Sequence, residues 1–429
     1  MRAVLTSHGS TGDIYPMIAL GRALLEAGHE VVFATAPLYR AAIERAGLEY
    51  RHLPPDWEKE IFIEFMRELN RAPLPLLQLR WIYKGALPFM GELIDAMDEA
   101  LKGADLLVSS YFFPQYRKLA ERHGIPFATF AFCHNLVPTS DYPPEGTPAL
   151  YNFPRRLQQR WNRFLWRISN QVVDFTVNRT VGELYQQKGL GRSEGFLLTP
   201  AELCMVAVSR ELMGGIEHDP RFKFTGFLRW QSEEAPEVQA ELEAFCAGEK
   251  VPIMTFGSVA FDDTHTIMSR FLKNWPRGKK IILQSGWAGL SVELERPEIK
   301  VVHQMSHDQL FRFASMVIHH GGAGTTASVL HAGVPNIIIP HIADQQWWAS
   351  EVVRLKAGLC LGKRKWPEKL PSYVRKIEKH AEYAERAREV ADTLAHENGP
   401  TYSVRLLEDF VRTRAERAAH GKRTAFDPN

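Results

Sequence analysis

Short apolar runs alternate with helix-like patterns along the chain. The runs lie at residues 3–6, 31–35, 105–109, 127–132 and 204–208, and then at 252–256, 280–283, 300–302, 317–318 and 336–339. Each is short enough for one buried strand. Between the first two runs, Met17, Leu20 and Leu24 recur at helical spacing, and Gly28 ends the pattern. This strand, loop, helix, strand order opens a doubly wound parallel sheet, which binds ligands at the carboxyl ends of its strands.

The pattern is interrupted between residues 211 and 236, which lack sustained periodicity and hold several glycines and prolines. At 429 residues the chain also exceeds one ordinary core. We therefore predict an N-terminal domain at 1–210, an interdomain linker at 211–236 and a second domain at 237–395. Residues 396–417 are expected to form a further helix, and the tail at 418–429 is expected to be disordered.

A glycine-rich turn lies near residue 322. After Val317 and Ile318 come two histidines, four small residues at 321–324, two threonines, a helical stretch and the next apolar run. A strand, turn, helix order leaves N–H groups unpaired at the helix N-terminus, where the helix dipole adds positive charge. We predict that the turn binds a phosphate, although close packing of a helix on a sheet also demands small residues.

Polar residues beside this turn extend the prediction. His320 and Thr325 can donate to phosphate oxygens, whereas His319, its neighbour on the strand, should point the opposite way. Asp344 and Gln345 follow the next strand, and a carboxylate beside an amide suits the hydroxyls of a sugar. One strand end therefore offers a diphosphate site and the next a sugar site.

These motifs resemble the donor-binding signature of nucleotide-sugar-dependent glycosyltransferases with the GT-B fold, in the family that holds bacterial macrolide, glycopeptide and sterol or lipid glycosyltransferases and the plant natural-product enzymes. The segment GSTGDIYP at 9–16 resembles the GxRGDxxP element of the sterol and glycopeptide branch, with Thr11 in place of arginine. ILQSGWAGL at 282–290 and SHDQLF at 306–311 resemble further blocks. The resemblance implies two Rossmann-like α/β domains that face each other across a cleft, with the last helix crossing back to the first domain.

The resemblance also implies roles for individual residues. The donor diphosphate is expected at Gly257, Ser258, His320 and the turn of Gly322, Ala323, Gly324 and Thr325. Sugar hydroxyls are expected at Asp344 and Gln345, and base and ribose at Met305 and His307. Gly12 is expected to be a donor-binding residue of the first domain. Trp287 either walls the nucleotide base or is an ordinary buried aromatic.

Asp13 stands where the family has its general base. An acceptor hydroxyl is protonated at neutral pH, and a positioned base gains about 10²- to 10⁴-fold by taking its proton. Asp13 can also cap the helix that follows it, and the two roles can coexist. His8 is a rival base that lies outside the matching block, so we interpret it as a solvent-facing or packing histidine.

Three regions of the sequence are relevant to how an acceptor could bind. Residues 56–89 are rich in Trp, Phe, Leu and Pro, which suggests a mobile apolar flap at the position of the family's acceptor-binding loops, with core packing as the alternative. His134 and Asn135, after the run at 127–132, are candidates for acceptor contact. The segment 151–171 predicts a basic amphipathic helix that either touches an anionic membrane through Arg155 to Arg167 or is an ordinary domain helix.

Composition argues against several classes of partner and site. A net charge of +2 gives no case for nucleic acid, and four scattered cysteines predict neither a zinc site nor a disulfide framework. The start of the chain lacks the pattern of a signal peptide, and no apolar window is long enough for a transmembrane helix, so we expect a cytoplasmic protein, with peripheral membrane contact left open. Two histidines without a Cys or carboxylate pair are poor evidence for a metal, and the family uses none.

We therefore predict an inverting, metal-independent glycosyltransferase without a cofactor, which moves glucose from UDP-glucose to a hydroxyl of an apolar acceptor such as a sterol, a terpenoid or carotenoid, a hydroxy fatty acid or a polyketide. The choices of UDP over dTDP and of glucose over another hexose rest on the resemblance. A nucleotide-sugar epimerase of the same architecture and a non-catalytic nucleotide-sugar-binding protein are the alternatives.

Overall fold

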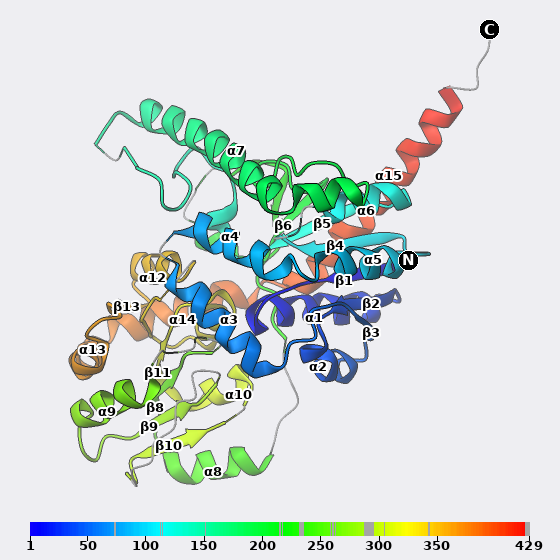
Figure 1. Ribbon diagram of the computed structural model, residues 1–429. Helices are drawn as coiled ribbons and strands as arrows, with labels where there is room; N and C mark the ends of the chain where they lie inside the picture. Colours follow the sequence, from blue (N-terminus) through cyan, green and yellow to red (C-terminus); the bar gives the residue numbers. More distant parts are fainter. Residues whose placement is uncertain are drawn as a thin grey trace.

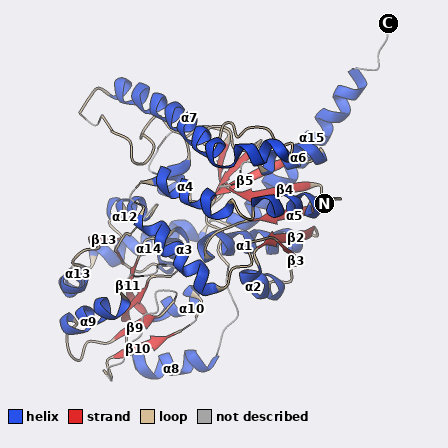
Figure 2. Ribbon diagram, viewed as in Figure 1, coloured by secondary structure: helices blue, strands red, loops and turns tan. Residues whose placement is uncertain are grey.

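The computed structural model describes every residue except 73, 112, 114, 151, 214–215, 217, 231–235, 258, 260, 262, 287–295, 304, 342–343 and 425–429, and it leaves out the side chains of 70 and 418–424. The chain forms two α/β domains, each built on a parallel sheet (Figure 1). Both sheets carry helices on their two faces (Figure 2), which confirms the predicted fold class.

The first sheet has seven parallel strands, β1 (Arg2–Thr6), β2 (Glu30–Thr35), β3 (Glu49–His52), β4 (Leu106–Ser110), β5 (Phe127–Ala131), β6 (Leu203–Val206) and β7 (Phe222–Phe224). Their spatial order is β3-β2-β1-β4-β5-β6-β7. The helices of this part of the chain are α1 (Thr11–Glu26), α2 (Arg40–Arg45), α3 (Lys59–Arg71), α4 (Pro75–Ala86), α5 (Met90–Ala100), α6 (Tyr116–His123) and α7 (Arg155–Gln187).

The second sheet has six parallel strands, β8 (Val251–Thr255), β9 (Ile281–Gln284), β10 (Ile299–Val302), β11 (Ala314–His319), β12 (Asn336–Ile338) and β13 (Gly358–Cys360), in the order β10-β9-β8-β11-β12-β13. Its helices are α8 (Pro236–Cys246), α9 (Thr264–Asn274), α10 (His307–Leu310), α11 (Ala323–Ala332), α12 (Gln345–Arg354), α13 (Trp366–Lys379) and α14 (Glu382–Ala395). A last helix, α15 (Gly399–Thr424), follows them.

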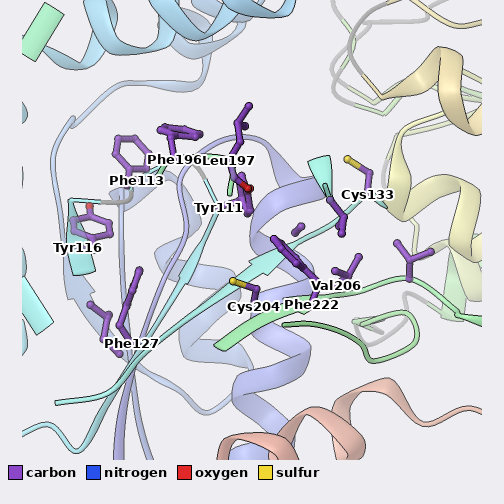
Figure 3. Close-up of a cluster of buried hydrophobic side chains, with 14 of the residues drawn as sticks. Tyr111, Phe113, Tyr116, Phe127, Cys133, Phe196, Leu197, Cys204, Val206 and Phe222 are labelled. Carbon is purple, nitrogen blue, oxygen red and sulfur yellow. The ribbon is translucent and has the colours of Figure 1, made fainter. Parts of the chain in front are cut away.

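Both faces of the first sheet are buried. Val4 of β1 belongs to one apolar cluster, whereas its neighbours Ala3 and Leu5 belong to a second cluster on the other face. Figure 3 shows part of the first cluster, where Phe127 and Phe222 lie among its labelled side chains. A strand that is buried on both sides reads as an unbroken apolar run, and this is why these strands were predictable.

The strands that the sequence pattern did not predict lie at sheet edges. β3 and β7 are the two edge strands of the first sheet, and β13 is an edge strand of the second. β7 lies inside the stretch predicted as linker, so the first sheet does not end with the run at 204–208. These three edge strands have one neighbour each and partly exposed positions, so they lack a recognisable apolar run, whereas the edge strand β10 was predicted at 300–302.

The segment predicted as a mobile flap is helical. It forms α3 and α4, which corrects that interpretation. Pro75 stands in the first turn of α4, where a helix has no use for the missing N–H group. Pro75 therefore marks a helix start instead of interrupting a helix.

The final helix returns to the first domain. Val404 and Leu407 of α15 are buried in the same apolar cluster as Leu20 and Leu24 of α1. His29 Nε2 lies 2.9 Å from Glu408 Oε1, and Arg414 forms an ion pair with Glu202. The last helix thus packs on the first domain, and α15 extends to Thr424, beyond the predicted helix end at 417. Of the predicted tail, residues 425–429 lie outside the described residues.

Candidate active site

A cavity of about 1760 Å³ lies between the domains, and both line it. The first domain contributes the loop before α1 and parts of α3, α4 and α7, and the second contributes the ends of β8 and β9 and the first turn of α11. Within it, Asp13 and Glu145 come from the first domain and His320, Gly324 and Asp344 from the second. The cavity therefore lies at the carboxyl ends of strands in both sheets, where such sheets bind ligands.

The N-terminus of α11 is bare. Its N-cap is Gly322, and no side chain caps the helix. The N–H groups of Ala323, Gly324 and Thr325 therefore begin the helix without an intrahelical acceptor. A Cβ atom built on Gly324 would meet nothing within 4 Å, so the space in front of this turn is open. The turn can hold an anion through N–H donors and the helix dipole.

His320 stands against this turn between two glycines. A Cβ atom at position 322 would lie 2.4 Å from His320 Nε2, and one at position 257 would lie 3.0 Å from its Cε1. His320 Nδ1 is buried and has no hydrogen-bond partner within the described part of the chain. Burial holds the pKa of His320 well below its ordinary value, so the ring is neutral at pH 7 and offers one N–H donor.

His319, unlike His320, is not among the residues that line the cavity, and it has a structural role. Its Nδ1 accepts from the Gly321 N–H group (3.2 Å), and its Nε2 donates to Asn336 Oδ1 (2.9 Å). The rings of the two histidines are nearly perpendicular, with centroids 6.5 Å apart. Among the described residues, no group of three or more His, Cys, Asp or Glu side chains is placed to hold a metal ion.

Hydrogen bonds join the ends of β8 and β9 at the cavity. Thr255 Oγ1 donates to Gln284 Oε1 (2.9 Å), and Gln284 Nε2 donates to the Met305 carbonyl oxygen (2.8 Å). This chain of bonds positions the segment of Met305 and His307, and both residues line the cavity. Ser258 and Trp287, also predicted here, lie outside the described residues.

The predicted sugar site lies at the start of α12. Gln345 lines the cavity, and its Oε1 accepts from the His341 N–H group (2.8 Å). Asp344 is the N-cap residue of α12 and also lines the cavity. Burial raises the pKa of Asp344 to about 7, and the nearby carboxylates of Asp13 and Glu145 add to the rise. Carboxylates from two domains therefore meet in one space.

Asp13 takes part in the capping of α1 and also lines the cavity. Its Oδ2 accepts from the Ser10 N–H group (2.8 Å) and lies 3.2 Å from Ser10 Oγ. A Cβ atom on Gly9, whose φ is +128°, would lie 2.4 Å from the same oxygen, so glycine is required there. Burial raises the pKa of Asp13 to about 6, and the Ser10 hydrogen bonds oppose the rise. The N-cap of α1 is Ser10 and not Asp13; Asp13 is the third residue of the helix and completes a capping box with Ser10, which corrects the predicted position of the cap. A carboxylate with this pKa is ionised at neutral pH. Gly12, its neighbour, lines the cavity as well.

His8 is held by its neighbours. Its Nε2 lies 2.8 Å from the Tyr116 hydroxyl oxygen, and its ring meets that of Phe113 edge-on at 4.6 Å. Burial lowers the pKa of His8 to about 4. Although His8 reaches the cavity wall, it packs as the sequence analysis expected.

Glu145 is a cavity residue that sequence reasoning missed. Its Oε2 accepts from Asn135 Nδ2 (3.0 Å), and burial raises the pKa of its carboxyl group. Glu145 lies in an irregular stretch after β5, where no periodicity or motif distinguishes it. Of the two predicted acceptor contacts, Asn135 lines the cavity, whereas the buried ring of His134 packs on Trp347 of α12 with centroids 3.5 Å apart.

Comparison with known proteins identifies the class. The glycosyltransferase family 28 N-terminal domain family matches residues 3–89, and the erythromycin biosynthesis protein CIII-like C-terminal domain family matches residues 289–410. Solved structures share the fold: the glycotransferase of kitacinnamycin has a TM-score of 0.68 at 19% identity over 95% of this chain and 98% of that chain. The spinosyn rhamnosyltransferase SpnG complexed with thymidine diphosphate has 0.64 at 17% identity, over 95% and 100%. The chain is a glycosyltransferase of the GT-B type.

Within this class the chain is similar in sequence to macrolide and sterol glycosyltransferases. It is 28% identical to O-mycaminosyltylonolide 6-deoxyallosyltransferase of Streptomyces fradiae, over 96% of this chain and 98% of that protein. It is also 28% identical to an uncharacterized glycosyltransferase of Mycobacterium tuberculosis, over 97% and 100%. The match to sterol 3-beta-glucosyltransferase of Candida albicans is 27% identical and covers 92% of this chain and 27% of that larger protein.

Proposed function

We propose that the protein transfers a hexose from a nucleotide diphosphate sugar to a hydroxyl group of an apolar acceptor, with inversion at the anomeric carbon and without a metal ion. One observation carries the proposal. The bare N-terminus of α11 and the carboxylate of Asp13 line the same cavity from opposite domains. An anion-binding helix end thus faces a candidate base.

The donor diphosphate is assigned to the first turn of α11 and to His320. Negative charge grows on the diphosphate as it leaves the sugar, and preformed N–H donors together with the helix dipole stabilise that charge. These groups supply what a divalent cation supplies in other transferases. We assign UDP-glucose as the donor. A glucosyltransferase among the relatives supports the sugar, and a structural neighbour complexed with thymidine diphosphate makes dTDP the competing nucleotide.

Asp13 is assigned as the general base. Its carboxylate takes the proton of the acceptor hydroxyl while the oxygen forms a bond to the anomeric carbon. The bond from that carbon to the phosphate oxygen breaks, and its electron pair leaves with the nucleoside diphosphate. Attack from the side opposite the leaving group inverts the configuration. A base with a pKa near 6 is ionised at neutral pH and accepts a proton more readily than an ordinary aspartate.

The acceptor is assigned to the part of the cavity formed by the first domain. Its wall carries mainly apolar side chains from α3, α4 and α7, including Phe62, Phe65, Leu79, Trp166 and Val173. Such a wall suits a sterol, a terpenoid or carotenoid, a hydroxy fatty acid or a polyketide. Asp13 and Glu145 mark the polar end, where the hydroxyl group must lie.

A panel assay tests the proposal. Purified protein is incubated with UDP-glucose or dTDP-glucose and a set of apolar alcohols. The products are detected by mass spectrometry, and their configuration is assigned by NMR. A new glycoside of opposite anomeric configuration to the donor is expected, and EDTA should not reduce its yield. An altered free nucleotide sugar would indicate an epimerase, and donor binding without turnover would indicate a binding protein. Either result would overturn the proposal.

A further inference from the structure

Helix α7 presents an apolar stripe to solvent. The helix is 33 residues long, and its first turns project beyond the rest of the first domain (Figure 1). The α7 stripe consists of exposed side chains that recur at helical spacing, namely Leu157, Phe164, Ile168, Val172 and Phe175, with exposed fractions of 39% to 60%. The helix already has a separate buried face, which includes Leu165, Trp166 and Val177. The stripe is therefore a second apolar surface and does not serve the core.

Arginines flank this stripe. From residue 155 to residue 173 the chain holds five arginines and no Asp or Glu. Arg155 makes an ion pair of 3.5 Å with Asp141. Arg156, Arg160, Arg163 and Arg167 are exposed, and the described side chains provide no ion-pair partner for them. This face therefore carries a strong local positive charge, although the whole chain has a net charge of only +2.

The neighbouring helix α4 enlarges the surface. α4 packs on α7, and Leu77 and Trp81 are exposed on it together with Arg80 and Lys84. Leu74, just before α4, is exposed as well. No Asp or Glu occurs between residues 74 and 89. We call the exposed side chains of 74–84 and 155–175 the α4–α7 face.

The α4–α7 face adjoins the cavity. Ile168 and Val172 belong to the α7 stripe, and both also line the cavity, as Leu74 does. The apolar outer surface is therefore continuous with the apolar wall assigned to the acceptor.

We propose that the α4–α7 face docks on an anionic lipid bilayer. Its aromatic and aliphatic side chains enter the interface, and its arginines pair with lipid phosphate groups, which match the guanidinium geometry. The positive charge of this face distinguishes between a lipid bilayer and a second copy of the chain as its partner. A second copy of this face would bring like charges together, whereas an anionic bilayer complements them. Together with the proposed function, this docking lets an acceptor dissolved in the bilayer reach Asp13 along an apolar path.

Vesicle co-sedimentation tests the docking without any sugar transfer. The full chain is mixed with vesicles of phosphatidylcholine alone or of phosphatidylcholine with about one third phosphatidylglycerol, the anionic component that basic faces attract. Sedimentation with the anionic vesicles is expected, with little at neutral vesicles, and binding should weaken as salt is raised. The double variant Arg156→Glu/Arg160→Glu should bind at least about 30-fold more weakly. The matched control Arg375→Glu/Lys376→Glu makes the same charge change on exposed residues of α13 and should bind like the unchanged protein.

The apolar part of the face has its own test. Phe164→Ser/Phe175→Ser should weaken binding by about tenfold or more, because two exposed rings no longer enter the interface. Tyr402→Ser, an exposed aromatic on α15, is the control and should change nothing. Equal binding of the arginine variant and the unchanged protein would overturn the proposal. Absence of binding to anionic vesicles would overturn it as well. If the unchanged protein does not bind these vesicles and the phenylalanine variant dissociates a dimer in sedimentation velocity, the face is a dimer interface and not a lipid-binding surface. Vesicle binding by a protein that fails the panel assay would refute the proposed function and leave the docking intact.

Discussion

Replacement of Asp13 by asparagine should raise stability and abolish transfer at the same time. The side chain keeps its size and retains an oxygen that can accept from the Ser10 N–H group. It loses the negative charge and the ability to take a proton. The two consequences have opposite signs, so they can be measured separately on one variant.

The effect on stability follows from burial. The pKa of Asp13 rises from 3.8 to about 6 in the folded protein. The unfolded chain therefore releases the proton at lower pH than the folded chain, and the folded state loses stability as pH rises from about 4 to about 6. Above both values the loss is about 3 kcal/mol. A neutral amide supports the N-terminus of α1 less well, by about 1 kcal/mol. The variant should therefore be more stable than the unchanged protein by about 2 kcal/mol at pH 8, with no such gain near pH 4.

The effect on transfer follows from the proposed role. Without the carboxylate no group in this position takes the acceptor proton, so kcat should fall by about 10²- to 10⁴-fold. The dissociation constant for the donor should stay within a few-fold, because His320 and the first turn of α11 are unchanged. Tm at pH 5 and pH 8, isothermal titration with UDP and the panel assay give the three readings.

A matched control separates this reasoning from a general effect of the substitution. Asp263 is the N-cap of α9, its Oδ1 accepts from the Thr266 N–H group (2.8 Å), and these hydrogen bonds lower its pKa. Asp263→Asn should therefore lower Tm slightly at pH 8 and leave turnover unchanged. Turnover of Asp13→Asn at the rate of the unchanged protein would refute the base assignment. A lower Tm for Asp13→Asn at pH 8 would refute the argument from the buried charge.

Three further predictions concern the same cavity. Because Asp13 and Asp344 have raised pKa values and face each other, kcat/KM should rise with pH between about 5 and 8 as the pair loses protons, and a flat profile would contradict an ionised base. His320→Ala should raise the dissociation constant for UDP by about tenfold or more, since a hydrogen bond to a charged phosphate is lost; equal affinity in titration calorimetry would exclude the phosphate role. Gly324→Ala should keep or raise Tm, because its methyl group meets open space and alanine favours the helix by up to about 1 kcal/mol, yet it should weaken UDP binding where that space is the phosphate site.

Much of the architecture was predictable because buried parallel strands have a simple signature. The central strands of both sheets are apolar on both faces, and the turn before α11 combines strand, glycines and helix in one short stretch. The edge strands β3, β7 and β13 lack that signature. The segment of α3 and α4 was misread, because prolines that begin a helix and prolines that break one look alike in sequence.

The candidate site was predictable only where the role of a residue follows from its own place in the local sequence pattern. The distinction between His319 and His320, of which only His320 lines the cavity, follows from the alternation of side chains along a strand. The meeting of Asp13, Glu145 and Asp344 does not, since it depends on how two domains pack across a cavity. The pKa values of these groups depend on that packing as well, so they cannot be predicted from residue type alone.

The return of α15 to the first domain has a consequence for biosynthesis. Part of the core around α1 comes from residues 404 and 407, which leave the ribosome after the whole second domain. The domain that is made first is therefore completed last. A protein cut within the linker would yield a first half in which the apolar surface normally covered by α15 is exposed. Early termination near residue 398 should likewise leave nascent chains that depend on chaperones.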